Sequence, residues 1–262
     1  SSEILRKRLD YTQIDNWVDN SAIESLQFSD FLRNNRCDVL VNHGWKSQGY
    51  KTAISNIDQE LETLLSTWDH LFSVIQTRNK NMRVIHTGTV YEAGEGGCHS
   101  SITDYGKLKS LFWSEFKELA KKYKIVVNKV VLPNPIGPLE SPSKLVSSFW
   151  AHWAAGKKPT LKTPHWVRDN ISLHKMLLAY EEALVATDGT VLRPSEFVCS
   201  NRELANTLSK LAQQNNFKEY RFHESVIDDE KEEWHRRTNS RDSNCEGLMT
   251  YLSKWLLKES VG

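Results

Sequence analysis

Cysteine is scarce in this 262-residue sequence, and the cysteines that occur form no Cys-x-x-Cys pair. They are Cys37, Cys98, Cys199 and Cys245. Disulfide frameworks and zinc sites use closer spacings, so this distribution favours reduced thiols in a cytoplasm. The nine histidines form no pair at metal-ligand spacing either. We therefore expect no metal site and a cytoplasmic protein.

An excess of charge of one sign is also missing, because the formal net charge is only +1. A general nucleic-acid binder would carry a basic face, so nucleic acid is not an expected partner. Short basic clusters such as Arg236-Arg237 are interpreted as solvated surface. No apolar run reaches the length of a membrane span, and no secretory signal is visible. We therefore expect no membrane partner.

A hydroxyl, a tyrosine and a lysine do occur in an order suited to proton transfer. Thr87 follows an apolar strand, a glycine-rich loop comes next, and Tyr105 and Lys109 open a helix. Residues four apart share a helix face, so Tyr105 and Lys109 can point into one cleft. A free tyrosine has a pKa of about 10, and a neighbouring ammonium lowers it. This pattern predicts Tyr105 as general acid and base, Lys109 as its electrostatic partner, and Thr87 as the residue that holds the substrate oxygen.

The spacing of Tyr105 and Lys109 alone also fits an ordinary amphipathic helix, so the prediction depends on the pattern of the surrounding sequence. Helical periodicity covers 28–36, 54–76, 104–122, 145–155, 170–186, 202–215 and 248–258. Extended runs are expected at 37–42, 84–87, 125–131, 160–162, 191–193 and 196–198. This alternation predicts an α/β fold with a doubly wound, mainly parallel, Rossmann-like sheet.

Several motifs follow one another along this pattern. They are Cys37-Asp38-Val39-Leu40-Val41-Asn42-His43-Gly44-Trp45, Thr87-Gly88-Thr89-Val90-Tyr91, Tyr105-Gly106-Lys107-Leu108-Lys109, Asn134-Pro135-Ile136-Gly137-Pro138, Trp166-Val167-Arg168-Asp169 and Ser200-Asn201-Arg202-Glu203-Leu204-Ala205. The ordered set resembles the extended short-chain dehydrogenase/reductase family, which includes nucleotide-sugar epimerases, dehydratases and reductases. The second motif resembles the Ser/Thr-x-x-Val-Tyr segment of that family, the third its Tyr-Gly-x-x-Lys, and the fourth its Asn-x-x-Gly-Pro turn beside the substrate.

The resemblance implies a role for each matching residue. Its catalytic residues would be Thr87, Tyr105 and Lys109. Its cofactor, NAD or NADP, would contact Asp19, Asn20, His43, Gly44, Trp45, Tyr105 and Lys109. A nucleotide-sugar substrate would contact Thr89, Asn134 and Arg168, the arginine facing a phosphate. For Asp19 the alternative of a helix N-cap stays open.

The resemblance also implies a division of the chain. Residues 1–132 would form a dinucleotide-binding, Rossmann-like region that is incomplete at its N-terminus. Residues 133–262 would form mainly a small substrate-binding lobe, with elements that return to the main sheet. Helices at 54–76 and 104–122 occupy the positions that pair across a dimer in the family, so a homodimer is expected.

One family feature is missing, because the sequence holds no Gly-x-x-Gly-x-x-Gly loop to cradle a pyrophosphate. Either that loop precedes residue 1 or the protein does without it. Gly88 and Thr89 stand where the dehydratases carry an acidic pair, which favours an epimerase or a 4-keto reductase. Two alternatives stay open: a non-catalytic sugar-nucleotide-binding or scaffold protein, and a reductase of a small non-nucleotide carbonyl compound.

Overall fold

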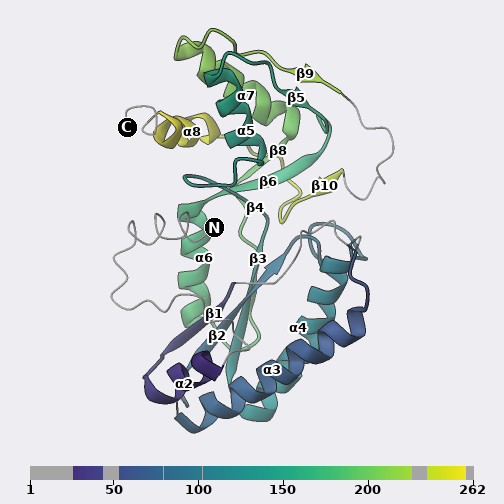
Figure 1. Ribbon diagram of the computed structural model, residues 1–262, viewed down its shortest axis with the longest axis vertical. Coiled ribbons are helices and arrows are strands. Elements are labelled where there is room, and N and C mark those ends of the chain that lie inside the picture. The colour runs from purple at the N-terminus through teal and green to yellow at the C-terminus, as the bar shows by residue number, and fades with distance from the viewer. Residues whose placement is uncertain (1–25, 44–52, 79, 102, 226–234, 258–262) are drawn as a thin grey trace.

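The computed structural model describes residues 26–43, 53–78, 80–101, 103–225 and 235–257. Its larger part is built on a parallel sheet (Figure 1). The strands are β1 (Val39–Asn42), β2 (Arg83–Thr89), β3 (Val126–Leu132) and β7 (Val191–Leu192), in the order β1-β2-β3-β7. The predicted α/β class with a mainly parallel sheet is therefore confirmed.

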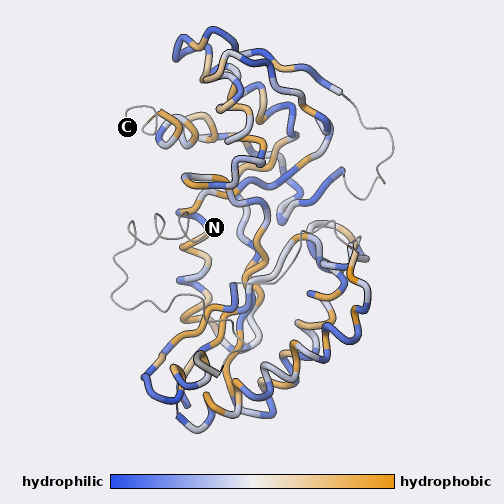
Figure 2. The backbone as a smooth tube through the Cα atoms, in the orientation of Figure 1, coloured by the Kyte–Doolittle hydropathy of each residue, from blue (hydrophilic) through white to orange (hydrophobic). Residues whose placement is uncertain are grey.

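Helices cover both faces of this sheet. On one face α2 (Leu26–Asn34), α3 (Ile57–Arg78) and α4 (Asp104–Tyr123) share a buried core with the strands, centred on Trp68, Phe72 and Phe116. On the other face α6 (Leu173–Val185) packs through Ala179 and Ala183 against β2 and β3. Hydrophilic and hydrophobic stretches alternate along α3 and α4 (Figure 2), as expected of helices with one buried face. Dimerisation through α3 and α4 stays a prediction.

Local signals fix the start and end of α4. The hydroxyl of Thr103 accepts a hydrogen bond from the backbone N–H of Gly106 at 2.9 Å, which caps the first turn. Lys124 ends the helix in the left-handed conformation, with φ of 56°. Because the cap lies two residues before Tyr105, it fixes the start of the helical turn that carries Tyr105.

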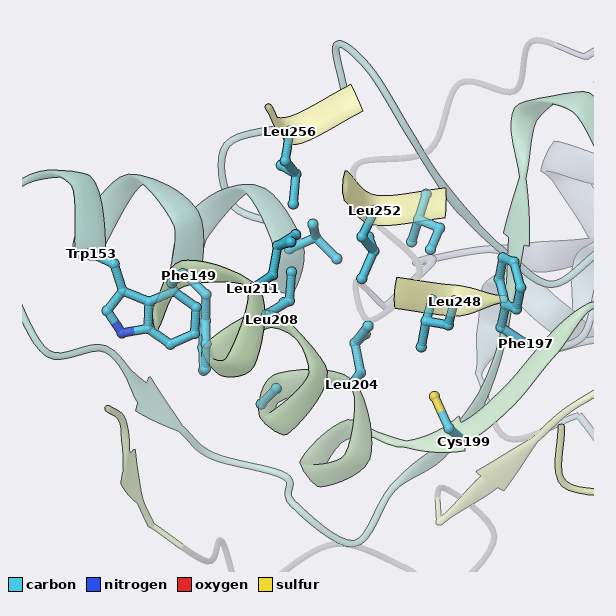
Figure 3. Close-up of a cluster of buried hydrophobic side chains, with 14 of the residues drawn as sticks. Phe149, Trp153, Phe197, Cys199, Leu204, Leu208, Leu211, Leu248, Leu252 and Leu256 are labelled. Atoms are coloured by element: carbon cyan, nitrogen blue, oxygen red, sulfur yellow. The ribbon is translucent and has the colours of Figure 1, made fainter. Parts of the chain in front are cut away.

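A smaller lobe stands on a second sheet. Its strands are β4 (Asn134–Ile136), β6 (Val167–Ser172), β8 (Phe197–Ser200) and β10 (Arg236–Arg237), with β8 antiparallel to β6 and the other pairs parallel. The helices α5 (Leu145–Ala154), α7 (Asn201–Gln214) and α8 (Leu248–Leu256) enclose a leucine-rich core with Phe149 and Trp153 (Figure 3). A two-stranded pair, β5 (Thr160–Leu161) and β9 (His223–Glu224), borders the lobe.

Two predictions of secondary structure are wrong. The expected helix 170–186 begins only at Leu173, because the residues before it form β6, which is flanked by β4, β8 and β10. Ser172 then caps the helix by accepting from the N–H of Lys175 at 3.1 Å. The turn expected at 134–138 contains a short strand, since Asn134 to Ile136 pairs with β6 before Gly137.

The prediction that Arg236-Arg237 is solvated surface is wrong for Arg237, whose side chain is fully buried. Arg237 is buried because β10 pairs with β6, and a pairing between distant segments cannot be predicted from local sequence. The four cysteines are free thiols. Among the described residues, no helix is long and apolar enough to cross a membrane, and no group of three His, Cys, Asp or Glu could hold a metal ion.

The N-terminus of α7 offers a test of how the lobe is stabilised. Ser200 and Glu203 form a capping box, in which the serine hydroxyl accepts from the N–H of Glu203 at 3.1 Å and the carboxylate accepts from the N–H of Ser200 at 2.7 Å. Ser200→Ala is expected to lower the free energy of unfolding by about 1 kcal/mol, measured by urea denaturation. Ser114→Ala on the exposed face of α4 is the matched control and should change it by less than about 0.5 kcal/mol.

Candidate active site

The carboxyl ends of β1 and β2 meet the first turn of α4 and one turn of α6. Thr87, near the end of β2, is buried, and its Oγ1 lies 2.6 Å from the hydroxyl of Tyr180 on α6. His43, directly after β1, places Nδ1 3.3 Å from Thr87 Oγ1 and 3.0 Å from the Tyr180 hydroxyl. Three elements that are distant in sequence therefore converge on the Thr87 hydroxyl.

Lys109 joins Thr87 from the other side. Its buried Nζ donates a hydrogen bond to the backbone carbonyl of Thr87 at 2.5 Å. The same Nζ lies 5.6 Å from the centre of the Tyr105 ring. The structure therefore brings Thr87, Tyr105 and Lys109 together, although the sequence separates Thr87 from the other two by a long loop.

The expectation that Lys109 lowers the pKa of Tyr105 is wrong for this arrangement. Burial first, and then the charges of Glu92 and Tyr91, raise the pKa of Tyr105 to about 12. Burial also lowers the pKa of Lys109 to about 8, with Glu92 opposing this and Lys129 adding to it. A phenol with a pKa of about 12 keeps its proton at neutral pH, so here Tyr105 is equipped as a proton donor.

A chain of paired charges, buried except for Arg193, borders the site. Lys129 on β3 forms an ion pair with Glu92, which follows β2, and its Nζ lies 3.7 Å from Glu95 Oε1. Arg193 holds Glu95 by two hydrogen bonds of 2.6 and 3.0 Å. The sequence-based reasoning did not include these residues. In the sequence, the one signal of a buried ion pair is the lysine inside the apolar run 125–131.

The remaining predicted residues are placed as follows. Thr89 is buried at the end of β2, where its N–H donates to Glu92 Oε1 at 2.7 Å. Asn134 belongs to the second sheet and donates to Asn170 Oδ1 at 2.7 Å. Arg168 is buried on β6, with its guanidinium 4.4 Å from the Trp166 ring. Asp19, Asn20, Gly44 and Trp45 lie outside the described residues.

A cavity of about 120 Å³ lies where the loop after β2 meets β10. Its walls are Gly94, Glu95, Gly96, Gly97, Arg193, Arg236, Thr238, Asn239 and Arg241. Thr238 and Asn239 anchor the β10 side, because Thr238 N–H donates to the Gly96 carbonyl at 3.4 Å and the Asn239 amide donates to the Val131 carbonyl at 2.8 Å. The three arginines give this cavity donors suited to an anionic ligand.

Comparison with protein-family models and with curated proteins gave no match to the sequence. Solved structures do match the fold. The chain resembles the UDP-glucuronic acid 4-epimerase of Bacillus cereus in complex with UDP-glucuronic acid and NAD, with a TM-score of 0.71, 13% identity, and coverage of 98% of this chain and 84% of that one. For the UDP-glucose 4-epimerase of Thermotoga maritima with UDP-glucose, the TM-score is 0.67 at 11% identity, over 100% and 96% of the chains.

A third match is the UDP-N-acetylglucosamine 4-epimerase of Methanobrevibacter ruminantium in complex with UDP-N-acetylmuramic acid, with a TM-score of 0.66, 12% identity and coverage of 97% and 87%. At such low identity, the likeness establishes the fold. The protein therefore has the Rossmann-like fold of the UDP-sugar 4-epimerases.

Proposed function

We propose that the protein is an NAD(P)-dependent epimerase or 4-keto reductase that acts on a nucleotide-linked sugar. One observation carries the proposal: Thr87, Tyr105 and Lys109 lie together at the carboxyl end of a parallel sheet whose fold matches the UDP-sugar epimerases. In open parallel α/β sheets, ligands bind in the crevice at that edge.

Each of the three side chains has a role in this scheme. Tyr105 exchanges a proton with the sugar oxygen, Thr87 donates a hydrogen bond that orients this oxygen, and the Lys109 ammonium balances the charge of the Tyr105 phenolate when it forms. A nicotinamide cofactor held at this edge of the sheet would supply the hydride chemistry at the sugar carbon. Oxidation of the carbinol requires Tyr105 as the phenolate, which takes the hydroxyl proton, and reduction of the ketone returns that proton from the neutral phenol.

The described residues fit the nicotinamide end of such a cofactor. The buried amine of Lys109 donates to the Thr87 carbonyl, which fixes its place beside Tyr105 at this edge of the sheet. His43 lies at the next strand end, so imidazole, hydroxyl and amine donors share one edge of the sheet. Roles of Asp19, Asn20, Gly44 and Trp45 in holding the rest of the cofactor remain predictions.

The arginine-lined cavity supports a nucleotide-linked substrate over a small neutral carbonyl compound. Arg193, which is paired with Glu95, and Arg236 and Arg241 line it, and guanidinium groups suit the negative charge of a diphosphate better than a neutral substrate. The proposal also includes a contact between Arg168 and a substrate phosphate. Thr89 and Asn134 are proposed as further substrate-binding residues.

A second candidate, a sugar-nucleotide-binding protein without turnover, is favoured by one specific contact. The Tyr180 hydroxyl lies 2.6 Å from Thr87 Oγ1, so the hydroxyl that would orient the substrate already has a partner. The raised pKa of Tyr105, about 12, also disfavours its action as a base in the free protein. In an active enzyme either Tyr180 donates to Thr87 while Thr87 donates to the substrate oxygen, or substrate binding displaces Tyr180 from Thr87.

Calorimetric titration with NADH and NADPH, repeated in the presence of UDP-glucose, separates the two candidates. For an enzyme we expect a cofactor dissociation constant on the order of micromolar, followed by sugar-dependent change in nicotinamide absorbance. Binding of the UDP-sugar without binding of either cofactor, in folded protein, would reject the enzyme and support the second candidate.

A further inference from the structure

A buried ion pair borders the Tyr105–Lys109 pair, and the acid/base scheme above does not use it. Only 3% of the Lys129 side chain and 1% of the Glu92 side chain are exposed. Glu92 uses Oε2 for Lys129 and Oε1 to accept from the N–H of Thr89. Buried charges destabilise a fold unless they are paired and hydrogen-bonded, and both carboxylate oxygens of Glu92 have a partner here.

Glycine at position 88 makes room for the pair. A Cβ there would lie 2.3 Å from Lys129 Cε and 2.9 Å from Glu92 Oε1, well inside normal contact distance. The register of the two strands explains this, because His86 lies opposite Lys129, and Gly88, two residues on, points its hydrogen to the same face. The gap in β2 and the charges of Glu92 and Lys129 therefore form one structural unit.

The charges of this unit reach the acid/base pair. Glu92 raises the pKa of both Tyr105 and Lys109, while Lys129 acts on Lys109 in the opposite direction. Among the described residues, the titratable and charged groups around the acid/base pair include Tyr91 and Glu92 after β2, His86 on β2, Lys129 on β3 and Arg237 on β10. Burial lowers the pKa of His86 well below its ordinary value, so His86 contributes no positive charge at neutral pH.

We propose that Glu92, held by Lys129 in the space left by Gly88, is a positioning residue that sets the charge balance of the Tyr105–Lys109 pair. The part of Glu92 in catalysis rests on the proposed function. Its effect on the pKa of Lys109 does not depend on that function. Glu92 supplies negative charge beside the pair, and Lys129 limits that charge. This role predicts that Glu92 and Lys129 shift the pKa of Lys109 in opposite directions.

The test is a pH titration of Lys109 in protein that carries ¹³C-labelled lysine, followed by NMR of the Cε resonance. Lys109→Arg assigns the signal. Glu92→Gln is expected to lower the pKa of Lys109, and Lys129→Met to raise it, each by on the order of one unit. Glu95→Gln is the matched control: its carboxylate lies 3.7 Å from Lys129 but is held by Arg193, and a change of only a few tenths of a unit is expected.

A single variant can fail to fold because it leaves one buried charge unpaired. The exchange Glu92→Lys/Lys129→Glu keeps a buried ion pair and reverses its direction, and it is therefore the decisive variant. We expect it to lower the pKa of Lys109 by on the order of one unit. An unchanged pKa in the folded exchange variant, or shifts of the same sign in both single variants, would overturn the proposal.

Turnover supplies an independent readout. The limb of the kcat–pH profile that reports the acid/base pair should shift in the same direction as the Lys109 titration, with KM changed less than kcat. Absence of turnover in the unmodified protein would reject the proposed function and leave the NMR result to decide on Glu92 and Lys129. Normal turnover with an unshifted Lys109 would reject the charge-balance role alone.

Discussion

Tyr105→Phe is expected to lower kcat by about 10²–10⁴-fold, the range that positioned proton transfer contributes. The substitution keeps the ring, whose centre lies 5.6 Å from the Lys109 amine, and removes only the hydroxyl. The fold should therefore stay unchanged, and the loss in kcat should exceed any loss of cofactor affinity that follows from removing a cofactor-contacting hydroxyl. Interconversion of UDP-sugars followed by chromatography gives kcat, and calorimetry gives the cofactor affinity separately.

Tyr123→Phe is the matched control for this experiment. Tyr123 is the last residue of α4, and its hydroxyl donates to Asp69 at 2.8 Å. At 1.5 Å of rise per residue it lies roughly 27 Å along the helix from Tyr105, so kcat should be unaffected. Full turnover of Tyr105→Phe would show that another group carries the proton, and Tyr180 beside Thr87 would be the first to examine.

The motif could be predicted from sequence because its geometry is local. Tyr105 and Lys109 share a face of one helix, and Thr103 before them is a cap that the sequence itself provides. Thr87 comes to the same edge because β2 and α4 follow one another in a right-handed α/β unit. Chain order and periodicity were therefore sufficient to place the three residues near one another.

The charges around the motif could not be predicted in this way. Glu92 and Lys129 are 37 residues apart and meet only because β2 and β3 are paired. Arg237 is buried because β10 adds to β6, a pairing between segments about 70 residues apart. A charged residue usually lies at the surface, so local composition favours the wrong environment for each of these side chains.

β6 was missed for a related reason. Its buried residues include Asp169 and Asn170, which local propensity disfavours in a strand. Asp169 nevertheless accepts hydrogen bonds from the N–H groups of Glu196 and Asn239 at 3.1 Å each, which ties β6 to the chain before β8 and after β10. Tertiary hydrogen bonds thus outweigh the local preference. The bond from Asn239 also holds a residue that lines the arginine-lined cavity.

The pH dependence of stability should reveal the burial of Lys109 without any substrate. Its pKa is about 8 in the folded protein and has an ordinary value of 10.5, which we take for the unfolded chain. Below pH 8 both states hold the proton, so the penalty of burying the charge is fully present. Between pH 8 and 10.5 the folded state releases the proton while the unfolded state keeps it, so stability rises with pH.

The gap between the two pKa values corresponds to about 3 kcal/mol. We therefore expect the free energy of unfolding of the unmodified protein, minus that of Lys109→Met, to increase by up to that amount across this window, as measured by urea denaturation at each pH. Lys107→Met, on the exposed side of the same helical turn, is the control and should give a flat difference. A flat difference for Lys109 too would mean that its amine is solvated, and the contact with the Thr87 carbonyl would then not hold in solution.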